Sequence, residues 1–261
     1  MLGFRLDKWY FDCATASGIV WVGYAATLHL GPIPLHYGAS ILQDGTESPT
    51  VQRQSLRCGR TSASPGLVSW SHPSLRIQGT WTGGVDTGPV VVHDGKSGRI
   101  TWHGRTLNAQ VAVTVDGREL VGLGYAEELE MTVPPWRLPF RELRWGRFIS
   151  DDRLRFATWI DMKGDPAGCR VWTERGASSG AVSDDAVLRG DGTRLVLKAE
   201  RTLRCENVAK SLLGRFHGLS RLFPRSMRNI GENKMIGTGP LVLEDGSEVR
   251  GVAVFEVVRW E

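Results

Sequence analysis

Apolar and polar residues alternate along several short runs of this chain, and a period of two is typical of β-strands. In the run Gln110–Val115, the residues Val111, Val113 and Val115 fall on one face. Residues 249–260 are apolar on both faces, which indicates a strand with a core on one side and a pocket or second sheet on the other. Repeated strands of this kind with short connections predict an all-β sandwich or barrel.

Asp-Gly pairs mark the connections that we expect to be hairpin turns. A type I′ turn needs a positive φ at both central residues, and Asp and Gly tolerate that conformation. Strand-like runs lie on both sides of most of these pairs, so we predict antiparallel hairpins around them. The pairs begin at Asp44, Asp94, Asp116, Asp191 and Asp245.

One segment, residues 206–223, has the period of an amphipathic helix. Val208, Leu212 and Phe216 recur at helical spacing, and Pro224 would end the helix. We predict that this helix docks on a sheet or closes the end of a barrel. Because its polar face is basic, a helix that makes peripheral contact with a membrane surface is the alternative.

The proline-rich segment Val133–Pro139 cannot be a central strand, because proline has no amide hydrogen to donate to a neighbouring strand. It lies near the middle of the chain, so we interpret it as a crossover between two β units. The predicted domains are residues 1–132 and residues 133–261. No sequence repeat relates the two halves.

Length and charge restrict the class of protein further. A chain of 261 residues with 41% hydrophobic residues can bury one large β core or two small ones. The formal charge of +4 is small and the basic residues are interleaved with acidic ones, which argues against a nucleic-acid partner. No run approaches the ~20 apolar residues of a membrane span, and the first residues lack a signal-peptide pattern, so we expect a cytoplasmic protein.

The cysteines and tryptophans are the notable residue types. Cys13, Cys58, Cys169 and Cys205 are far apart and have no metal-ligand spacing, so we expect free buried thiols and no metal site. The chain has ten tryptophans, many of them in strand-like runs. Indole rings fill β cores well, but they also line apolar ligand pockets, and the pattern alone leaves both interpretations open.

Chemistry is most plausible at the residues Tyr125 and Glu127, which lie two apart on an extended run and therefore point to the same side. If that side is an apolar interior, burial raises the pKa of Glu127, which then holds a proton at neutral pH and acts as a general acid. The alternative is a solvated strand edge, because Glu128 and Glu130 follow closely. The chain contains no nucleophile elbow, zinc-binding helix motif or phosphate loop.

The stretch that begins at Trp102 and the run Gly122–Glu127 resemble the carotenoid hydratase (hydroxyneurosporene synthase) family and the related AttH-type proteins and tocopherol cyclases. In the hydratases a His-x-Trp element precedes a strand and a Gly-x-Gly-Tyr-x-Asp element follows it. Trp102, Tyr125 and Glu127 match the tryptophan, the tyrosine and the acid. Ile100 stands at the position of the family's histidine, and the acid is glutamate rather than aspartate.

The resemblance implies two fused lipocalin-like domains, each an antiparallel β-barrel or half-barrel. The helix that the apolar spacing predicts at 206–223 would lie near the C-terminus of the second domain. It implies an enzyme without a cofactor, a hydratase (lyase) or a cyclase or isomerase, that acts on a bulky apolar, isoprenoid- or polyene-like molecule. Glu127 would donate the proton. Trp102 and Tyr125 would stabilise the resulting cation through their π faces.

The run Leu143–Arg147 resembles the tryptophan-rich strand that follows in this family, and we predict that it contributes to ligand binding. Two alternatives to catalysis by proton transfer remain open: a non-catalytic binder or carrier of an apolar ligand, which the isoleucine at position 100 favours, and a cyclase that works by shape alone. The predicted ligand-binding residues are Trp145, Arg147, Trp159, Tyr24 and His36.

Overall fold

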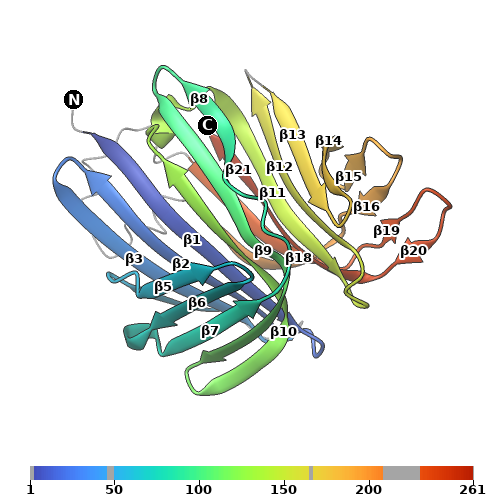
Figure 1. The fold of residues 1–261 in the computed structure, drawn as a ribbon, viewed down its shortest axis with the longest axis horizontal. Coiled ribbons are helices and arrows are strands. Elements are labelled where there is room, and N and C mark those ends of the chain that lie inside the picture. The colour runs from blue at the N-terminus through green and yellow to red at the C-terminus, as the bar shows by residue number, and fades with distance from the viewer. Residues whose placement is uncertain (1–2, 46–49, 165–166, 208–229, 261) are drawn as a thin grey trace. The chain divides into compact units, whose positions relative to one another are not determined.

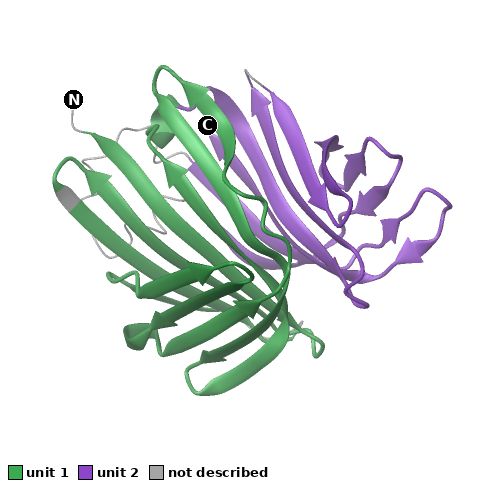
Figure 2. Cartoon of the chain, in the orientation of Figure 1, with its two compact units in different colours: residues 1–137 green, residues 138–261 purple. Residues whose placement is uncertain are grey.

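The computed structural model describes residues 3–45, 50–164, 167–207 and 230–260. The regular elements in these ranges are β-strands and two 3₁₀ turns, so the predicted all-β class is confirmed. The chain divides into two compact units, residues 1–137 and residues 138–261 (Figure 2).

Unit 1 is a ten-stranded antiparallel sheet (Figure 1). Its strands are β1 (Phe4–Thr15), β2 (Val20–Leu30), β3 (Ile33–Gln43), β4 (Val51–Ser55), β5 (Arg60–Ser64), β6 (Leu67–His72), β7 (Ile77–Thr82), β8 (Val90–Gly95), β9 (Gly98–Val115) and β10 (Arg118–Met131), with 3₁₀ turns at Pro73–Leu75 and Pro135–Arg137. The strand order is β4-β3-β2-β1-β10-β9-β7-β6-β5, and β8 pairs with β9. The sheet curls into a half-barrel that stays open between its end strands β4 and β5.

Unit 2 is an eleven-stranded antiparallel sheet. Its strands are β11 (Phe140–Ser150), β12 (Phe156–Gly164), β13 (Gly168–Thr173), β14 (Gly176–Val182), β15 (Ala186–Arg189), β16 (Arg194–Val196), β17 (Ala199–Asn207), β18 (Ile230–Gly237), β19 (Leu241–Val242), β20 (Glu248–Val249) and β21 (Gly251–Trp260). The strand order is β17-β18-β21-β11-β12-β13-β14-β15-β16-β19-β20.

Four of the five Asp-Gly pairs lie between antiparallel partner strands, as predicted. In the three that begin at Asp44, Asp191 and Asp245 only the glycine has a positive φ, so the type I′ turn is wrong there. Asp116 and Gly117 connect β9 to β10 and have φ values of 56° and 86°, as a type I′ turn requires. Asp94 and Gly95 instead lie inside β8, where Gly95 pairs with Gly98. The turn therefore falls two residues later than the sequence predicts.

The predicted helix at 206–223 lies almost entirely outside the described residues, and so does the membrane contact suggested for it. Residues 206 and 207 are the last two residues of β17, so a helix that begins at 206 is wrong. In the part of the chain that the structure describes, no helix has the length and apolar character needed to cross a bilayer.

Tryptophan rings fill the interior of the unit 1 half-barrel. Phe11 lies between Trp70 and Trp81, with ring centroids 4.8 Å away on each side, and Trp21 joins the same buried cluster. The indole N–H of Trp81 donates a hydrogen bond to the backbone oxygen of Asp12 at 2.8 Å. These rings are thus fully packed and their polar atoms are satisfied, which gives these three tryptophans a structural role.

The four cysteines are free, as predicted. Cys13 is buried, and Cys58 and Cys169 are partly buried. Cys205 is exposed, so the expectation of burial is wrong for this thiol.

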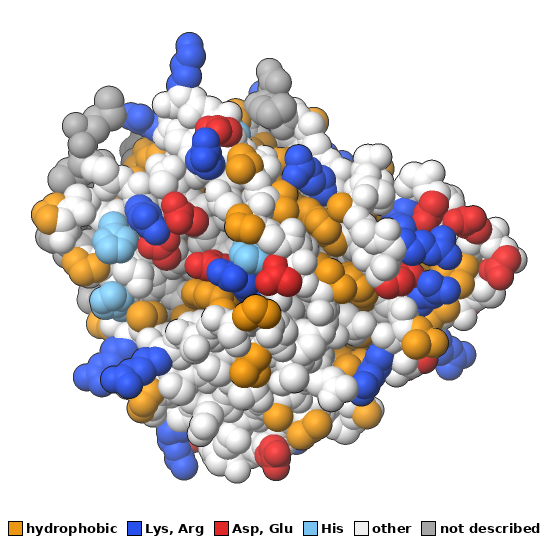
Figure 3. Space-filling view, in the orientation of Figure 1, with side chains coloured by type: hydrophobic (Ala, Val, Ile, Leu, Met, Phe, Trp, Pro, Cys, Tyr) orange, Lys and Arg blue, Asp and Glu red, His pale blue; other side chains and the backbone are white. Residues whose placement is uncertain are grey.

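The charged surface is mixed in sign, as the interleaved sequence predicts. Arg5 contacts Asp7 at 2.9 Å and Glu130 at 3.1 Å at the surface of unit 1. Figure 3 shows basic, acidic and histidine side chains interspersed on the viewed face.

Candidate functional site

Glu127 carries a buried carboxyl group in β10, where the residue is 4% exposed. Its Oε2 atom accepts hydrogen bonds from the indole N–H of Trp102 and from the hydroxyl of Tyr125. The alternation that places Tyr125 and Glu127 on one side of the strand therefore holds. The solvated-edge interpretation does not describe Glu127, although Glu130 on the same strand is exposed.

An irregularity in the pairing of β9 with β10 lies beside this carboxyl group. The register shifts twice, between Gly124 and Ala126 and between Ala126 and Glu127. Asn108 on β9 has a φ of 60°, which a non-glycine residue adopts only where the strand is distorted. Bulges of this kind redirect side chains and are common next to active sites.

Two further buried side chains lie on the adjacent strand β1. Tyr10 is directly opposite Glu127, and Asp12 is directly opposite Tyr125. The hydroxyl of Tyr10 donates to Oδ2 of Asp12 at 3.1 Å, and Asp12 is fully buried. The rings of Tyr10 and Tyr125 are 5.7 Å apart. Opposite residues of an antiparallel pair point to the same face, so both acids belong to one buried site.

Tyr10 and Asp12 are not among the site residues that the sequence predicts. A signal for them was present, because the run Tyr10–Asp12 repeats the tyrosine-x-acid spacing of Tyr125–Glu127 inside a largely apolar strand. An acid at alternating spacing in such a strand points to the same side as the tyrosine two residues before it.

Tyr24 borders this site from strand β2. Its ring is 5.4 Å from the ring of Tyr10, and the Nζ of Lys8 lies 5.6 Å from the centre of the Tyr24 ring. Tyr10, Tyr24 and Tyr125 thus form a tyrosine cluster across three neighbouring strands. Aromatic rings of this kind present π faces that can attract a cation.

His36 and His103 lie on the other face of the unit 1 sheet from the buried carboxyl group. His36, a predicted ligand-binding residue, is exposed, and its Nδ1 contacts Thr27 Oγ1 at 3.1 Å and Cys58 Sγ at 3.7 Å. His103 follows Trp102 in sequence but pairs with Asp86 at 2.5 Å. The structure therefore does not bring His36 together with the buried site.

The other three predicted ligand-binding residues belong to unit 2. Trp145 and Arg147 share one face of β11, where Lys234 Nζ lies 4.8 Å from the centre of the Trp145 ring and also pairs with Glu256. Arg147 is 1% exposed. Trp159 points to the opposite side, where it packs into the apolar core of unit 2. The structure thus groups Trp145 with Arg147 and separates Trp159 from them.

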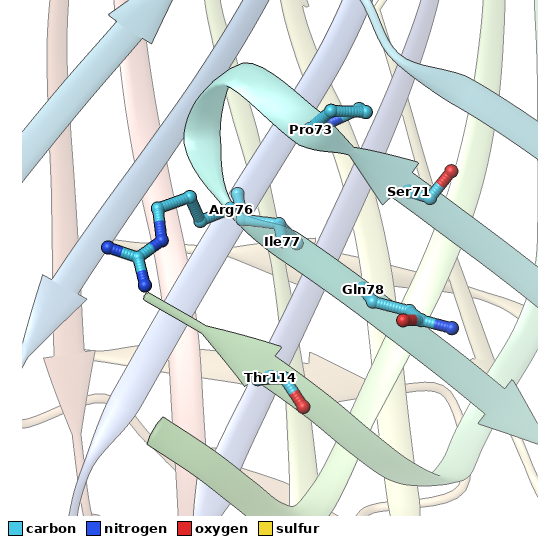
Figure 4. A pocket seen from close by; sticks show the side chains of 6 residues that line it. All are labelled: Ser71, Pro73, Arg76, Ile77, Gln78 and Thr114. Carbon is cyan, nitrogen blue, oxygen red and sulfur yellow. The ribbon is translucent and has the colours of Figure 1, made fainter. Parts of the chain in front are cut away.

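A recess of about 320 Å³ opens on unit 1 (Figure 4). None of the predicted site residues lines it. In the described ranges, no three His, Cys, Asp or Glu side chains are grouped as the ligands of a metal ion would be. The residues that line the recess are Ser71, Pro73, Arg76, Ile77, Gln78 and Thr114.

The fold is similar to that of several solved structures. An AttH-type protein from Nitrosomonas europaea superposes with a TM-score of 0.55 and 12% identity over 99% of this chain and 93% of that chain. Kievitone hydratase from Nectria haematococca superposes with a TM-score of 0.60 and 9% identity over 98% of this chain and 89% of that chain. CghA, in a structure with Sch210972, superposes with a TM-score of 0.60 and 10% identity over 99% of this chain and 89% of that chain.

No protein-family model and no curated protein sequence matches the chain. The likeness to the solved structures is therefore one of three-dimensional structure at very low sequence identity. It confirms the fold that the resemblance implies. The chain has the AttH/lipocalin-like fold that these hydratase, CghA and AttH-type structures share.

Proposed function

We propose that this chain is an enzyme that protonates an alkene in a bulky apolar, isoprenoid- or polyene-like small molecule without a cofactor. Hydration, isomerisation or cyclisation of the resulting cation then gives the product. The observation that carries this proposal is the buried carboxyl group of Glu127, held by Trp102 and Tyr125 on one face of the sheet.

The hydrogen bonds suggest how Glu127 would act. Trp102 and Tyr125 both donate to Oε2 and so hold the carboxyl group in a fixed orientation on this face. As this proton forms a C–H bond with one alkene carbon, the π electrons of the double bond are consumed and the other carbon becomes cationic. Trp102 and Tyr125 stabilise the negative charge that develops on the carboxyl group, and preorganised donors are most effective in a buried site.

The fate of the cation decides the reaction. A water molecule that adds to it and loses a proton gives an alcohol. Loss of a proton from the neighbouring carbon gives an isomer, and attack by a second double bond gives a ring. The tyrosine cluster offers aromatic faces to the cation in each case, and cation–π contacts gain strength when they are desolvated. A hydratase among the proteins of this fold supports the class of reaction.

The substitution Glu127→Gln tests the proposal. The amide keeps the shape of the side chain and an oxygen that accepts from Trp102 and Tyr125, but it has no acidic proton. Purified protein is incubated with neurosporene or farnesol in D₂O, and the products are separated by mass. The wild type should form a product heavier by one heavy-water molecule or a deuterated isomer, and the variant should lose ~10²–10⁴-fold in rate.

The neighbouring substitution Glu128→Gln is the matched control. Glu128 pairs with Arg105 at 2.6 Å on the opposite face of the strand. Its substitution should therefore leave turnover unchanged. The melting temperature of Glu127→Gln should stay close to that of the wild type. A stable Glu127→Gln protein with full activity, or a wild type that converts neither polyene, would overturn the proposal.

Ile100 favours a second candidate function, a non-catalytic binder of an apolar ligand. This side chain is buried and stands where the hydratase family has its histidine, so a proton-carrying group is replaced by a hydrocarbon. A binder would return both polyenes unchanged in D₂O while native mass spectrometry detects the complex. A cyclase that works by shape would give the same cyclisation rate in the wild type and in Glu127→Gln.

A further inference from the structure

The buried site contains two tyrosine–acid pairs that run in opposite directions on neighbouring strands. On β1 the hydroxyl of Tyr10 donates to Asp12 at 3.1 Å, and on β10 the hydroxyl of Tyr125 donates to Glu127. The register places Tyr10 opposite Glu127 and Asp12 opposite Tyr125. Each acid is therefore beside the tyrosine of the other pair, and the two carboxyl groups are diagonal neighbours.

Two acids on one buried face of neighbouring strands suit a reaction that needs an acid and a base. Diagonal neighbours in an antiparallel pair have Cα atoms about 7–8 Å apart. Asp12 and Glu127 are 0% and 4% exposed, so bulk water does not serve as the base in their place.

We propose that Asp12 is the general base that completes the reaction begun by Glu127; this inference rests on the proposed function. Glu127 gives its proton to the alkene and becomes a carboxylate. A water oxygen forms the C–O bond to the cation as Asp12 accepts one of the water protons. In an isomerisation, Asp12 takes a proton from the neighbouring carbon instead. Asp12 then returns its proton to Glu127, so no net proton is consumed.

The groups around Asp12 fit this role. Tyr10 donates to Oδ2 of Asp12 at 3.1 Å and so holds the carboxyl group in position. Tyr125 is the cross-strand neighbour of Asp12, and Lys8 lies on the same face of β1 near Tyr24, where it adds positive charge to this side of the sheet. Gly124 has no side chain, and a Cβ there would come within 2.9 Å of Oδ1 of Asp12. The backbone oxygen of Asp12 would be nearer still, at 2.1 Å, so the glycine allows β1 and β10 to approach closely beside Asp12.

Deuterium exchange separates the two acids experimentally. In D₂O with neurosporene, Asp12→Asn should lose hydrated product by ~10²–10⁴-fold, as is usual when a general base is removed. Glu127 still protonates the alkene in this variant and the cation reverts, so deuterium should enter the recovered neurosporene at close to the wild-type rate. Glu127→Gln should lose both the product and the exchange. Asp7→Asn, on the other face of β1, is the matched control and should retain both.

Each outcome distinguishes the two proposals. If Glu127→Gln is inactive while Asp12→Asn forms product at the full rate, the role of Asp12 is wrong and the proposed function stands. If the wild type gives neither product nor exchange, both fail. Should Asp12→Asn not fold, Tyr10→Phe replaces it: loss of the hydrogen bond to Asp12 should reduce hydration by ~10-fold without reducing exchange. Unchanged hydration in Tyr10→Phe would also overturn the role of Asp12.

Discussion

A missing side chain at Gly104 makes room for the hydrogen bond between Trp102 and Glu127. Gly104 lies directly opposite Glu127 on β9. A Cβ at this position would come within 2.8 Å of Cη2 of Trp102 and within 2.7 Å of Cδ2 of Leu107. Real carbon atoms do not approach so closely, so any larger residue must displace the indole ring or the leucine.

We therefore expect Gly104→Ala to destabilise the protein by about 1–3 kcal/mol, the usual cost of overpacking a core. Gly231→Ala is the matched control, because a Cβ at this strand glycine has no neighbour within 4 Å and should change stability by less than about 0.5 kcal/mol. Urea unfolding measures both free energies. Equal stability of the two variants would show that the ring of Trp102 is not confined by Gly104.

Local sequence spacing identifies part of the site and misses the rest for a physical reason. Tyr125 and Glu127 share a side because of strand alternation alone, and the structure joins them by a hydrogen bond. Asp12 comes beside them only through the register between β1 and β10, which are far apart in the chain. Register depends on pairing between distant segments, so no local pattern indicates that the two acids meet.

Strands β11 and β21 are joined at their ends by a carboxylate that contacts two arginines. Glu142 accepts from Nε of Arg144 at 2.5 Å and from Nε of Arg259, its cross-strand partner, at 2.8 Å. Burial acts to raise the pKa of Glu142, but the hydrogen bonds from both arginines outweigh it and hold the pKa below its ordinary value of 4.5. The folded state thus favours the ionised carboxylate.

This ion cluster predicts how stability depends on pH. Because the folded-state pKa is lowered, the contribution of Glu142 is complete above its ordinary pKa and is lost as the pH falls through the folded-state value. We expect Glu142→Gln to cost about 1–3 kcal/mol at pH 7, and this difference from the wild type should shrink below pH ~4.5. Urea unfolding across this range, with the exposed Glu248→Gln as control, would reject the idea if the difference stays constant.

Hairpins and helices differ in how well the sequence predicts them. At Asp116–Gly117 both residues adopt positive φ, so the local preference and the strand pairing agree. At Asp94–Gly95 the pairing of β8 with β9 extends through the dipeptide, and the turn moves to residues 96–97. Strand pairing also overrides the local preference at the start of the predicted helix, because pairing with β18 keeps residues 206 and 207 in a strand.

At the scale of the whole molecule, the fold class follows from the sequence because alternation and turn residues recur along most of the chain. The order of strands does not follow from it. The central neighbours β1 and β10 in unit 1, and β11 and β21 in unit 2, come from opposite ends of their units. Each of these pairings closes a long loop, which costs conformational entropy. The free energy that offsets this cost comes from the buried cores around Trp70 and Trp159, which form only when the strands have met.

The free cysteines report on these two cores separately. Cys13 is 0% exposed in the core of unit 1. Cys169 lies in unit 2, where burial, followed by the charge of Asp161, raises the pKa of its thiol to about 12. The thiolate is the reactive form, so only about one Cys169 thiol in ten thousand is ionised at pH 8. Cys205 is exposed.

We expect iodoacetamide at pH 8 to modify Cys205 of the folded protein first, and Cys58 more slowly because it is partly buried. Cys13 and Cys169 should react at least ~100-fold more slowly than Cys205, since one is inaccessible and the other is not ionised. Peptide mass spectrometry gives the rate at each site, and all four should react alike in concentrated urea. Labelling over a urea series would measure the opening of unit 1 at Cys13 and of unit 2 at Cys169. Rapid labelling of either residue in the folded protein would contradict the packing of that unit's core.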